Sequence, residues 1–260
     1  MQFQLFGFPV SIEGSFLLTL GLLGFFSAGG DTGLVVAFVV IGAISVLIHE
    51  FGHAFAARSQ GVIGIPTISL AGMAGLTRYR LKEAPTRLQS IFISFAGPLT
   101  GVVLGAGVLV FDQANVLADT SFNNNLINIA LFTTFGWSAF NLLPIVPLDG
   151  GHIMTDLIPG DRQTRQRRAA LVSVVFSVAA GILLLVWFGT GAIFGIFILG
   201  SMAMQNITIF SKSREAARIT PALTPRQGDL RDMPGTAETA SPDGAPTPES
   251  PGEQPPPPAQ

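Results

Sequence analysis

Cysteine is absent from this sequence of 260 residues, and charged residues make up only 12% of it. The chain therefore has neither disulfides nor thiolate ligands, and any metal site must use histidine, aspartate or glutamate. Soluble domains carry about 25% charged residues, so this composition, with a mean hydropathy of +0.54, indicates a membrane protein. The net charge of −2 and the lack of a basic cluster interleaved with aromatic residues exclude nucleic acid as an expected partner.

Long uncharged runs predict about six membrane-spanning helices, because a helix needs about 20 apolar residues to cross the hydrocarbon core. A cleaved signal peptide begins with basic residues, and none precedes the first run, so we expect this run to be retained as a span. The last run breaks at Gly189-Thr190-Gly191, which predicts a helical hairpin. The sequence thus predicts an all-α polytopic membrane protein with spans at residues 14–30, 33–57, 88–111, 123–143, 169–188 and 191–210.

The basic residues predict the orientation of these spans. All 14 lysines and arginines fall between spans two and three, between spans four and five, or after span six. Cytoplasmic loops carry such an excess of basic residues, so we expect both termini to lie in the cytoplasm. In the loops on the opposite side, the only charged residues are Asp31, Asp112 and Asp119.

Two segments have the composition of strands rather than helices. Residues 62–79 mix β-branched residues with glycines, which predicts a small β-hairpin or sheet between spans two and three. The opening residues 2–12 are a further strand candidate, and we expect residues 65–76 to offer an exposed strand edge. Prolines collect among polar residues near the C-terminus, so we divide the chain into a membrane domain at 1–210 and a disordered, Pro-rich cytoplasmic tail at 211–260.

The motif HEFGH, residues 49–53, carries two of the three histidines. On a helix, His49 and His53 project from the same face, so both imidazoles can reach one metal ion. Glu50 lies beside them and can accept a proton from water bound to that metal. Ionisable groups at membrane depth are costly and usually mark a function, and this motif directly follows an apolar run.

A zinc site needs a third protein ligand, which leaves the fourth position for water. The best candidate is Asp149 in NLLPIVPLDG (141–150), because it is the only acid near the cytoplasmic end of span four. Asn141 could hold the substrate backbone or an oxyanion, or could simply satisfy carbonyl groups at the end of its helix. His152 could orient Asp149 or lie at the surface, and we do not count it as a ligand.

HEFGH (49–53), FAGP (95–98) and NLLPIVPLDG (141–150) together resemble the site-2 protease family of intramembrane metalloproteases. The resemblance covers roughly residues 1–210 and implies that His49, His53 and Asp149 bind one Zn²⁺ per chain while Glu50 is the catalytic base. It also implies a multi-pass protein of a prokaryotic cell membrane whose substrates are other membrane proteins in the lipid bilayer. The segment between Pro98 and Asn141 is too short for the PDZ domain that several members insert, so we expect a compact form.

The sequence therefore predicts a zinc-dependent intramembrane endopeptidase that hydrolyses peptide bonds within or next to transmembrane segments. A second reading is a catalytically silent scaffold of the same fold, which would not need an intact HExxH and LDG. A third is a metal transporter, but transporters usually show repeated halves, and no such repeat is visible here. We expect FAGP to serve helix packing, because small residues let helices approach closely, and we assign it no catalytic or binding role.

Overall fold

The computed structural model of the protein describes residues 1–189 and 193–223. The chain divides into one compact unit from Met1 to Ala216 and a second from Ala217 to Gln260, and the elements that build the candidate site belong to the first. Helix α8 (Ile193–Leu223) extends beyond residue 210, where we expected the sixth span to end. The rest of the predicted disordered tail, from residue 224 onward, lies outside the described residues.

A four-stranded sheet forms from two hairpins that are far apart in the sequence. β1 pairs antiparallel with β2, β2 pairs parallel with β3, and β3 pairs antiparallel with β4. The order β1-β2-β3-β4 makes β1 and β4 the edge strands of the sheet. Both predicted strand segments are thus confirmed, and the sheet is larger than expected because the N-terminal hairpin adds two strands. The strands are β1 (Gln2–Leu5), β2 (Phe8–Ile12), β3 (Thr67–Ala71) and β4 (Ala74–Arg78).

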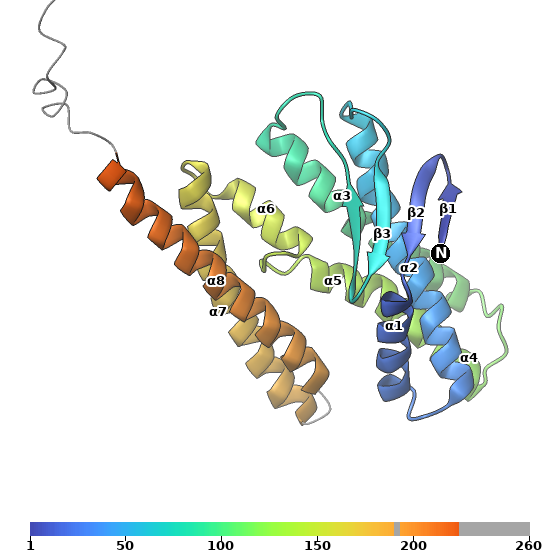
Figure 1. Cartoon of the computed structure of the whole chain (residues 1–260). Coiled ribbons are helices and arrows are strands. Elements are labelled where there is room, and N and C mark those ends of the chain that lie inside the picture. Colours follow the sequence, from blue (N-terminus) through green and yellow to red (C-terminus); the bar gives the residue numbers. More distant parts are fainter. Residues whose placement is uncertain (190–192, 224–260) are drawn as a thin grey trace, which may run out of the picture. The chain divides into compact units, whose positions relative to one another are not determined.

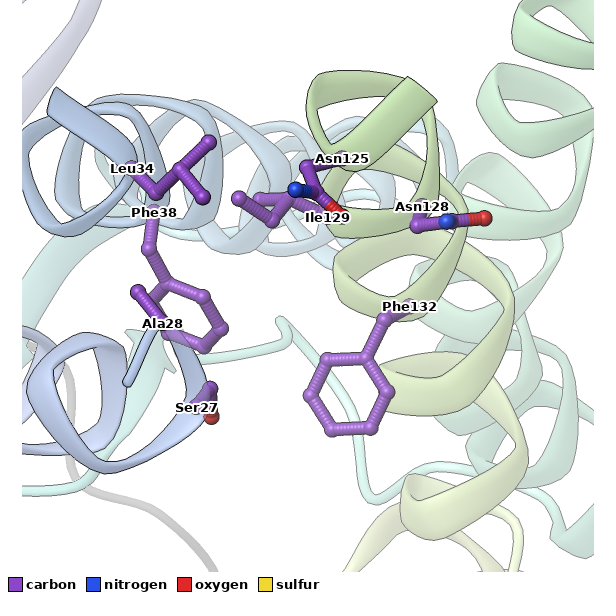
Figure 2. A pocket seen from close by; sticks show the side chains of 8 residues that line it. All are labelled: Ser27, Ala28, Leu34, Phe38, Asn125, Asn128, Ile129 and Phe132. Carbon is purple, nitrogen blue, oxygen red and sulfur yellow. The ribbon is translucent and has the colours of Figure 1, made fainter. Parts of the chain in front are cut away.

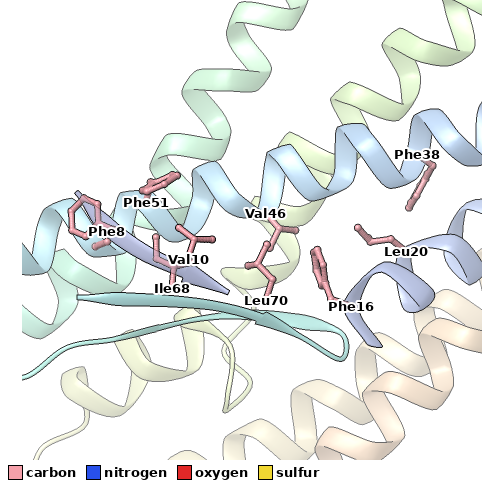
Figure 3. Close-up of a cluster of buried hydrophobic side chains, with 10 residues drawn as sticks. Phe8, Val10, Phe16, Leu20, Phe38, Val46, Phe51, Ile68 and Leu70 are labelled. Atoms are coloured by element: carbon pink, nitrogen blue, oxygen red, sulfur yellow. The ribbon is translucent and has the colours of Figure 1, made fainter. Parts of the chain in front are cut away.

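The two central strands bury alternate side chains against helix α2 (Thr32–Ser59), as strand periodicity requires. These side chains form the main apolar cluster with residues of α1 (Gly14–Ser27) and α2, shown in Figure 3. The sheet therefore lies along the half of α2 that carries HEFGH. The cluster consists of Phe8, Val10, Phe16, Leu20, Phe38, Val46, Phe51, Ala54, Ile68 and Leu70.

Helices α2 and α3 (Arg87–Gln113) approach each other closely. A Cβ atom added at Gly52 of α2 would lie 2.6 Å from the main-chain oxygen of Ala96 in α3, so only glycine permits this approach. The Thr100 hydroxyl is also bonded across this interface, to the main-chain oxygen of Ile48 at 3.3 Å. The contact brings the backbone of α3 against the turn of α2 that carries the histidines.

The remaining helices follow in chain order (Figure 1). Residues 121–141 form a continuous helical run that a π-helical turn divides, and a loop connects this run to the short helix α6. Helices α7 and α8 then form the last helical hairpin, although residues 190–192 of its turn lie outside the described residues. The bounds are α4 (Ser121–Leu131), η1 (Phe132–Gly136), α5 (Trp137–Asn141), α6 (Asp149–Leu157) and α7 (Arg162–Phe188).

All six predicted apolar runs fold as helices, but only four described helices are long and apolar enough to cross a membrane. These are α2, α3, and the segments Arg162–Trp187 and Ile193–Ser213. Helix α1 has only 14 residues, and the run at 121–141 is divided into three segments. The predicted count of six spans is therefore not confirmed.

Candidate metal centre

The two histidines of HEFGH meet within α2. The helix places them one turn apart, and their Nε2 atoms lie 3.2 Å from each other. Both side chains are buried, as is that of Glu50 between them in the sequence. The pattern expected of this motif on a helix is therefore realised, with three candidate metal-binding groups whose ligand atoms lie within 4.8 Å of one another.

Asp149 joins the histidines from a distant part of the chain. It is the first residue of α6, and its carboxylate points back toward α2. Its Oδ2 lies 3.1 Å from His49 Nε2, and its Oδ1 lies 3.3 Å from His53 Nε2. The structure thus brings together the three residues that the sequence suggests as ligands.

These three residues fit a zinc ion. Their ligand atoms lie 3.1 to 3.3 Å apart, close to the roughly 3.3 Å that separates ligands on a tetrahedral zinc with bonds of about 2.0–2.1 Å. His53 Nδ1 is 2.7 Å from the main-chain oxygen of Ile93, and donating to this carbonyl leaves Nε2 free to bind metal. Two neutral imidazoles and a carboxylate form a donor set that suits zinc.

Gly97, in the FAGP segment of α3, lies directly against the two imidazoles. A Cβ atom at this position would overlap His53 Nε2 and lie 2.8 Å from His49 Nε2. The sequence assigns this segment to helix packing alone, and the contact with the imidazoles shows that this interpretation is incomplete. A glycine among other small residues of an apolar helix carries no signal in the sequence that would separate the two roles.

Glu50 is held by the edge strand β4. Its Oε2 accepts a hydrogen bond of 2.6 Å from the Thr77 hydroxyl, and Gly75 leaves room for the rest of the carboxylate. Gly75 and Thr77 are two residues apart, so they lie on the same face of the strand. Neither residue could be identified from the sequence, because β4 reaches Glu50 only when the sheet packs against α2.

These groups line a cavity of about 560 Å³ between α2, β4, α3 and α6. Asn141 also lines it, but its Nδ2 donates to the main-chain oxygen of Trp137 within its own helix, at 2.9 Å. His152, which is largely exposed, lies at the cavity wall as well. Partial burial, followed by the charges of Asp156 and Asp149, raises the pKa of Tyr79 above its usual 10.0.

A second cavity, of about 310 Å³, lies near the opposite end of α2 (Figure 2). Leu34, at this end, precedes His49 by 15 residues, or about 22 Å along the helix. Its lining contains amides and a hydroxyl but no titratable side chain, so of these two cavities it is the first that has groups able to bind a metal or move a proton. The second is lined by Ser27, Ala28, Leu34, Phe38, Asn125, Asn128, Ile129 and Phe132.

Comparison with known proteins agrees with this arrangement. The model of "Peptidase family M50" matches residues 37–116 and 107–188, which together cover more than half of the chain and include HEFGH and the LDG segment. The chain belongs to peptidase family M50. The predicted resemblance is thus confirmed, and with its apolar helices this M50 member is an integral membrane protein.

Two curated relatives of the M50 chain are a candidate zinc metalloprotease of Synechocystis sp. and a zinc metalloprotease of Methanocaldococcus jannaschii. The first is 30% identical over 168 residues, which are 60% of this chain and 43% of the relative. The second is 27% identical over 164 residues, covering 60% of this chain and 44% of the relative. The chain therefore spans about two fifths of the length of the curated relatives it matches.

A solved structure, the site-2 protease from Methanocaldococcus jannaschii, has the same fold as this M50 chain. The TM-score is 0.52 at 20% sequence identity, over 83% of this chain and 94% of that one. The likeness extends beyond the segments that the family model matches, because 83% of the chain is more than residues 37–188 contain.

Proposed function

We propose that this chain is a zinc-dependent endopeptidase that hydrolyses peptide bonds within or next to transmembrane segments of other membrane proteins. One observation carries the proposal: two histidines, an aspartate and a separate buried glutamate converge on one cavity among helices of membrane-spanning character. The names of the relatives as zinc metalloproteases support the same chemistry.

His49, His53 and Asp149 would hold the ion, one per chain. A bound zinc would supply Lewis-acid polarisation of a carbonyl and of water. Glu50 is close to these ligands but is bonded to Thr77 rather than to them, which leaves its second carboxylate oxygen for proton transfer. Glu50 takes a proton from the attacking water and delivers it to the nitrogen of the leaving amine as the C–N bond breaks.

Asn141 remains a proposed contact for the substrate backbone or the oxyanion. Its side chain is 9% exposed and reaches the cavity, and its amide nitrogen is already engaged by its own helix. Any hydrogen bond that it donates to a substrate must therefore use the second amide hydrogen.

The free edge of β4 is the proposed docking site for the substrate. Peptide bonds inside a helix are shielded, so a membrane substrate has to unwind, and an extended segment can pair with an exposed strand edge. The sequence predicts this edge within residues 65–76; β3 is paired on both sides, and the edge strand is β4, whose first three residues, 74–76, fall within that segment. A two-residue turn joins β3 to β4, so Ala71 and Ala74 form a hydrogen-bonded pair, and every second pair after it is hydrogen-bonded too. Gly75 and Thr77 occupy the positions between these pairs. Their main-chain groups therefore point away from β3, toward the free edge.

The positions of the basic residues support a proposal for orientation. Both termini would lie in the cytoplasm of a prokaryotic cell, with a membrane domain at 1–210 and a tail at 211–260. Arg165, at the start of α7, pairs with Asp156 of α6 at 3.2 Å, so α6 and the metal ligand at its first residue belong to the same side.

Comparing membrane proteins between a deletion strain, a wild-type strain and a Glu50→Gln strain tests the function. Substrates should remain uncut in both the deletion and the Glu50→Gln strain, and purified wild-type protein should cut them until a chelator is added. A scaffold or a metal transporter would show the same membrane proteins in the wild-type and Glu50→Gln strains.

A further inference from the structure

Three polar side chains are buried in the last helical hairpin, within segments that are apolar enough to cross a membrane. Ser173 and Asn206 are 0% exposed and Ser177 is 2% exposed. Polar groups in such helices are costly unless they are paired, so their partners indicate why they are there.

Two of these side chains bind the same residue of the loop before α6. The Val146 main-chain N–H donates to the Ser173 hydroxyl at 2.9 Å, and Asn206 Nδ2 donates to the Val146 main-chain oxygen at 2.6 Å. Both polar main-chain groups of Val146 are therefore held by side chains, one from α7 and one from α8.

The neighbours of each side chain determine its orientation. Asn206 Nδ2 also donates to the Met202 main-chain oxygen at 2.9 Å, and because both partners are carbonyls, the amide nitrogen must face them. Ser173 donates its own hydrogen to the Ala169 oxygen at 2.8 Å, so it can only accept from Val146. Neither side chain can turn over and still make both of its contacts.

Apolar packing supports the same attachment. Ile145 and Leu148, on either side of Val146 and its following proline, are buried together with Leu199 of α8. The loop is also closed on itself by a bond from the Leu148 N–H to the Ile145 oxygen, at 2.8 Å. Asp149 follows Leu148 directly, so the position of its carboxylate depends on how this loop is held.

We propose that Asn206 and Ser173 are positioning residues for Asp149: by holding Val146 from α8 and α7, they keep the carboxylate at the distance that His49 and His53 require. The inference rests on the zinc site of the proposed function, but not on cleavage. Asn206 lies outside the segments that the family model matches, which end at residue 188.

The test is the zinc affinity of the purified full-length chain in detergent, measured by competition with a chelator. Asn206→Leu and Ser173→Ala should each raise the zinc dissociation constant about 10- to 100-fold, as expected for groups that orient metal ligands. Ser177→Ala is the matched control, because this serine is buried one turn along α7 and its hydroxyl has no partner among the described residues. It should bind zinc as the wild type does.

A second background separates positioning from general damage to the fold. In Asp149→Ala protein the carboxylate is gone, so Asn206→Leu or Ser173→Ala should weaken zinc binding no further. An equal loss in both backgrounds, or wild-type affinity in both variants, would overturn the proposal. If Asn206→Leu does not fold, the Ser173→Ala and Ser177→Ala pair decides the question.

Hydrogen exchange of metal-free protein tests the attachment without zinc. Amides in the loop at 142–148 should exchange faster in Ser173→Ala than in Ser177→Ala, and equal exchange would contradict the proposal. Zinc binding without cleavage would refute the proposed function and leave this inference standing.

Discussion

Gly97→Ala is expected to damage the metal site while leaving the helix intact. Alanine favours a helix over glycine by about 1 kcal/mol, so on propensity alone the change should stabilise α3. The added methyl group would, however, overlap His53 Nε2 and lie 2.8 Å from His49 Nε2. Carbon and nitrogen atoms need about 3.5 Å, so His49 must move by roughly 0.7 Å and His53 by more.

Such a displacement is larger than a zinc site tolerates, because metal–ligand distances vary by only about 0.2 Å. We expect the zinc dissociation constant to rise at least about 10- to 100-fold, the range for changes that disturb ligand orientation. Chelator competition on purified protein measures this effect, and circular dichroism measures helix content, which should not change.

Gly107→Ala is the matched control for this prediction. Gly107 lies on the same helix, and a Cβ atom there would have nothing within 4 Å. This variant should bind zinc like the wild type and be slightly more stable. Wild-type zinc affinity in Gly97→Ala would refute the assigned contact between α3 and the imidazoles.

Three further predictions concern the base, the strand edge and the orientation. Thr77→Val removes a hydrogen bond to the Glu50 carboxylate, so it should lower kcat about 10-fold or more with zinc still bound. Thr77→Ser keeps the hydroxyl and should keep most activity. Equal kcat values in the two variants would contradict the role of this hydrogen bond. A photo-crosslinker at Leu76 on the β4 edge should capture substrate in an inactive background, and one at Phe3 on the opposite edge should not; the reverse result would exclude β4. A reporter after Arg87 should read cytoplasmic and one near Asn115 external, and a cytoplasmic signal at Asn115 would overturn the orientation.

Local sequence patterns were enough to predict the parts of the site that depend on local structure. His49 and His53 are one helical turn apart, so their convergence follows from helix geometry alone. Asp149 was predicted by a different route, from its place after an apolar run and within a short motif. The structure places its carboxylate 3.1 Å from His49, although 100 residues separate the two.

Contacts between distant segments could not be predicted in the same way. The parallel pairing of Val10 with Ile68 joins the two hairpins into one sheet, and no local pattern specifies it. Nor does any local pattern specify that the Thr77 hydroxyl of this sheet donates to Glu50 of α2. The count of six spans stays a prediction, because α1 has only 14 residues and a π-helical turn divides the helical run at 121–141.

The most direct test of the central claim is to measure zinc content and cleavage on the same purified samples of wild type, Glu50→Gln and Asp149→Ala. Glu50→Gln keeps the shape of the side chain and loses the proton acceptor. It should retain close to one zinc per chain and lose about 10²- to 10⁴-fold in activity. Asp149→Ala removes one of three protein ligands and should lose both zinc and activity. Normal cleavage by Glu50→Gln, or full zinc and normal cleavage in Asp149→Ala, would contradict the account.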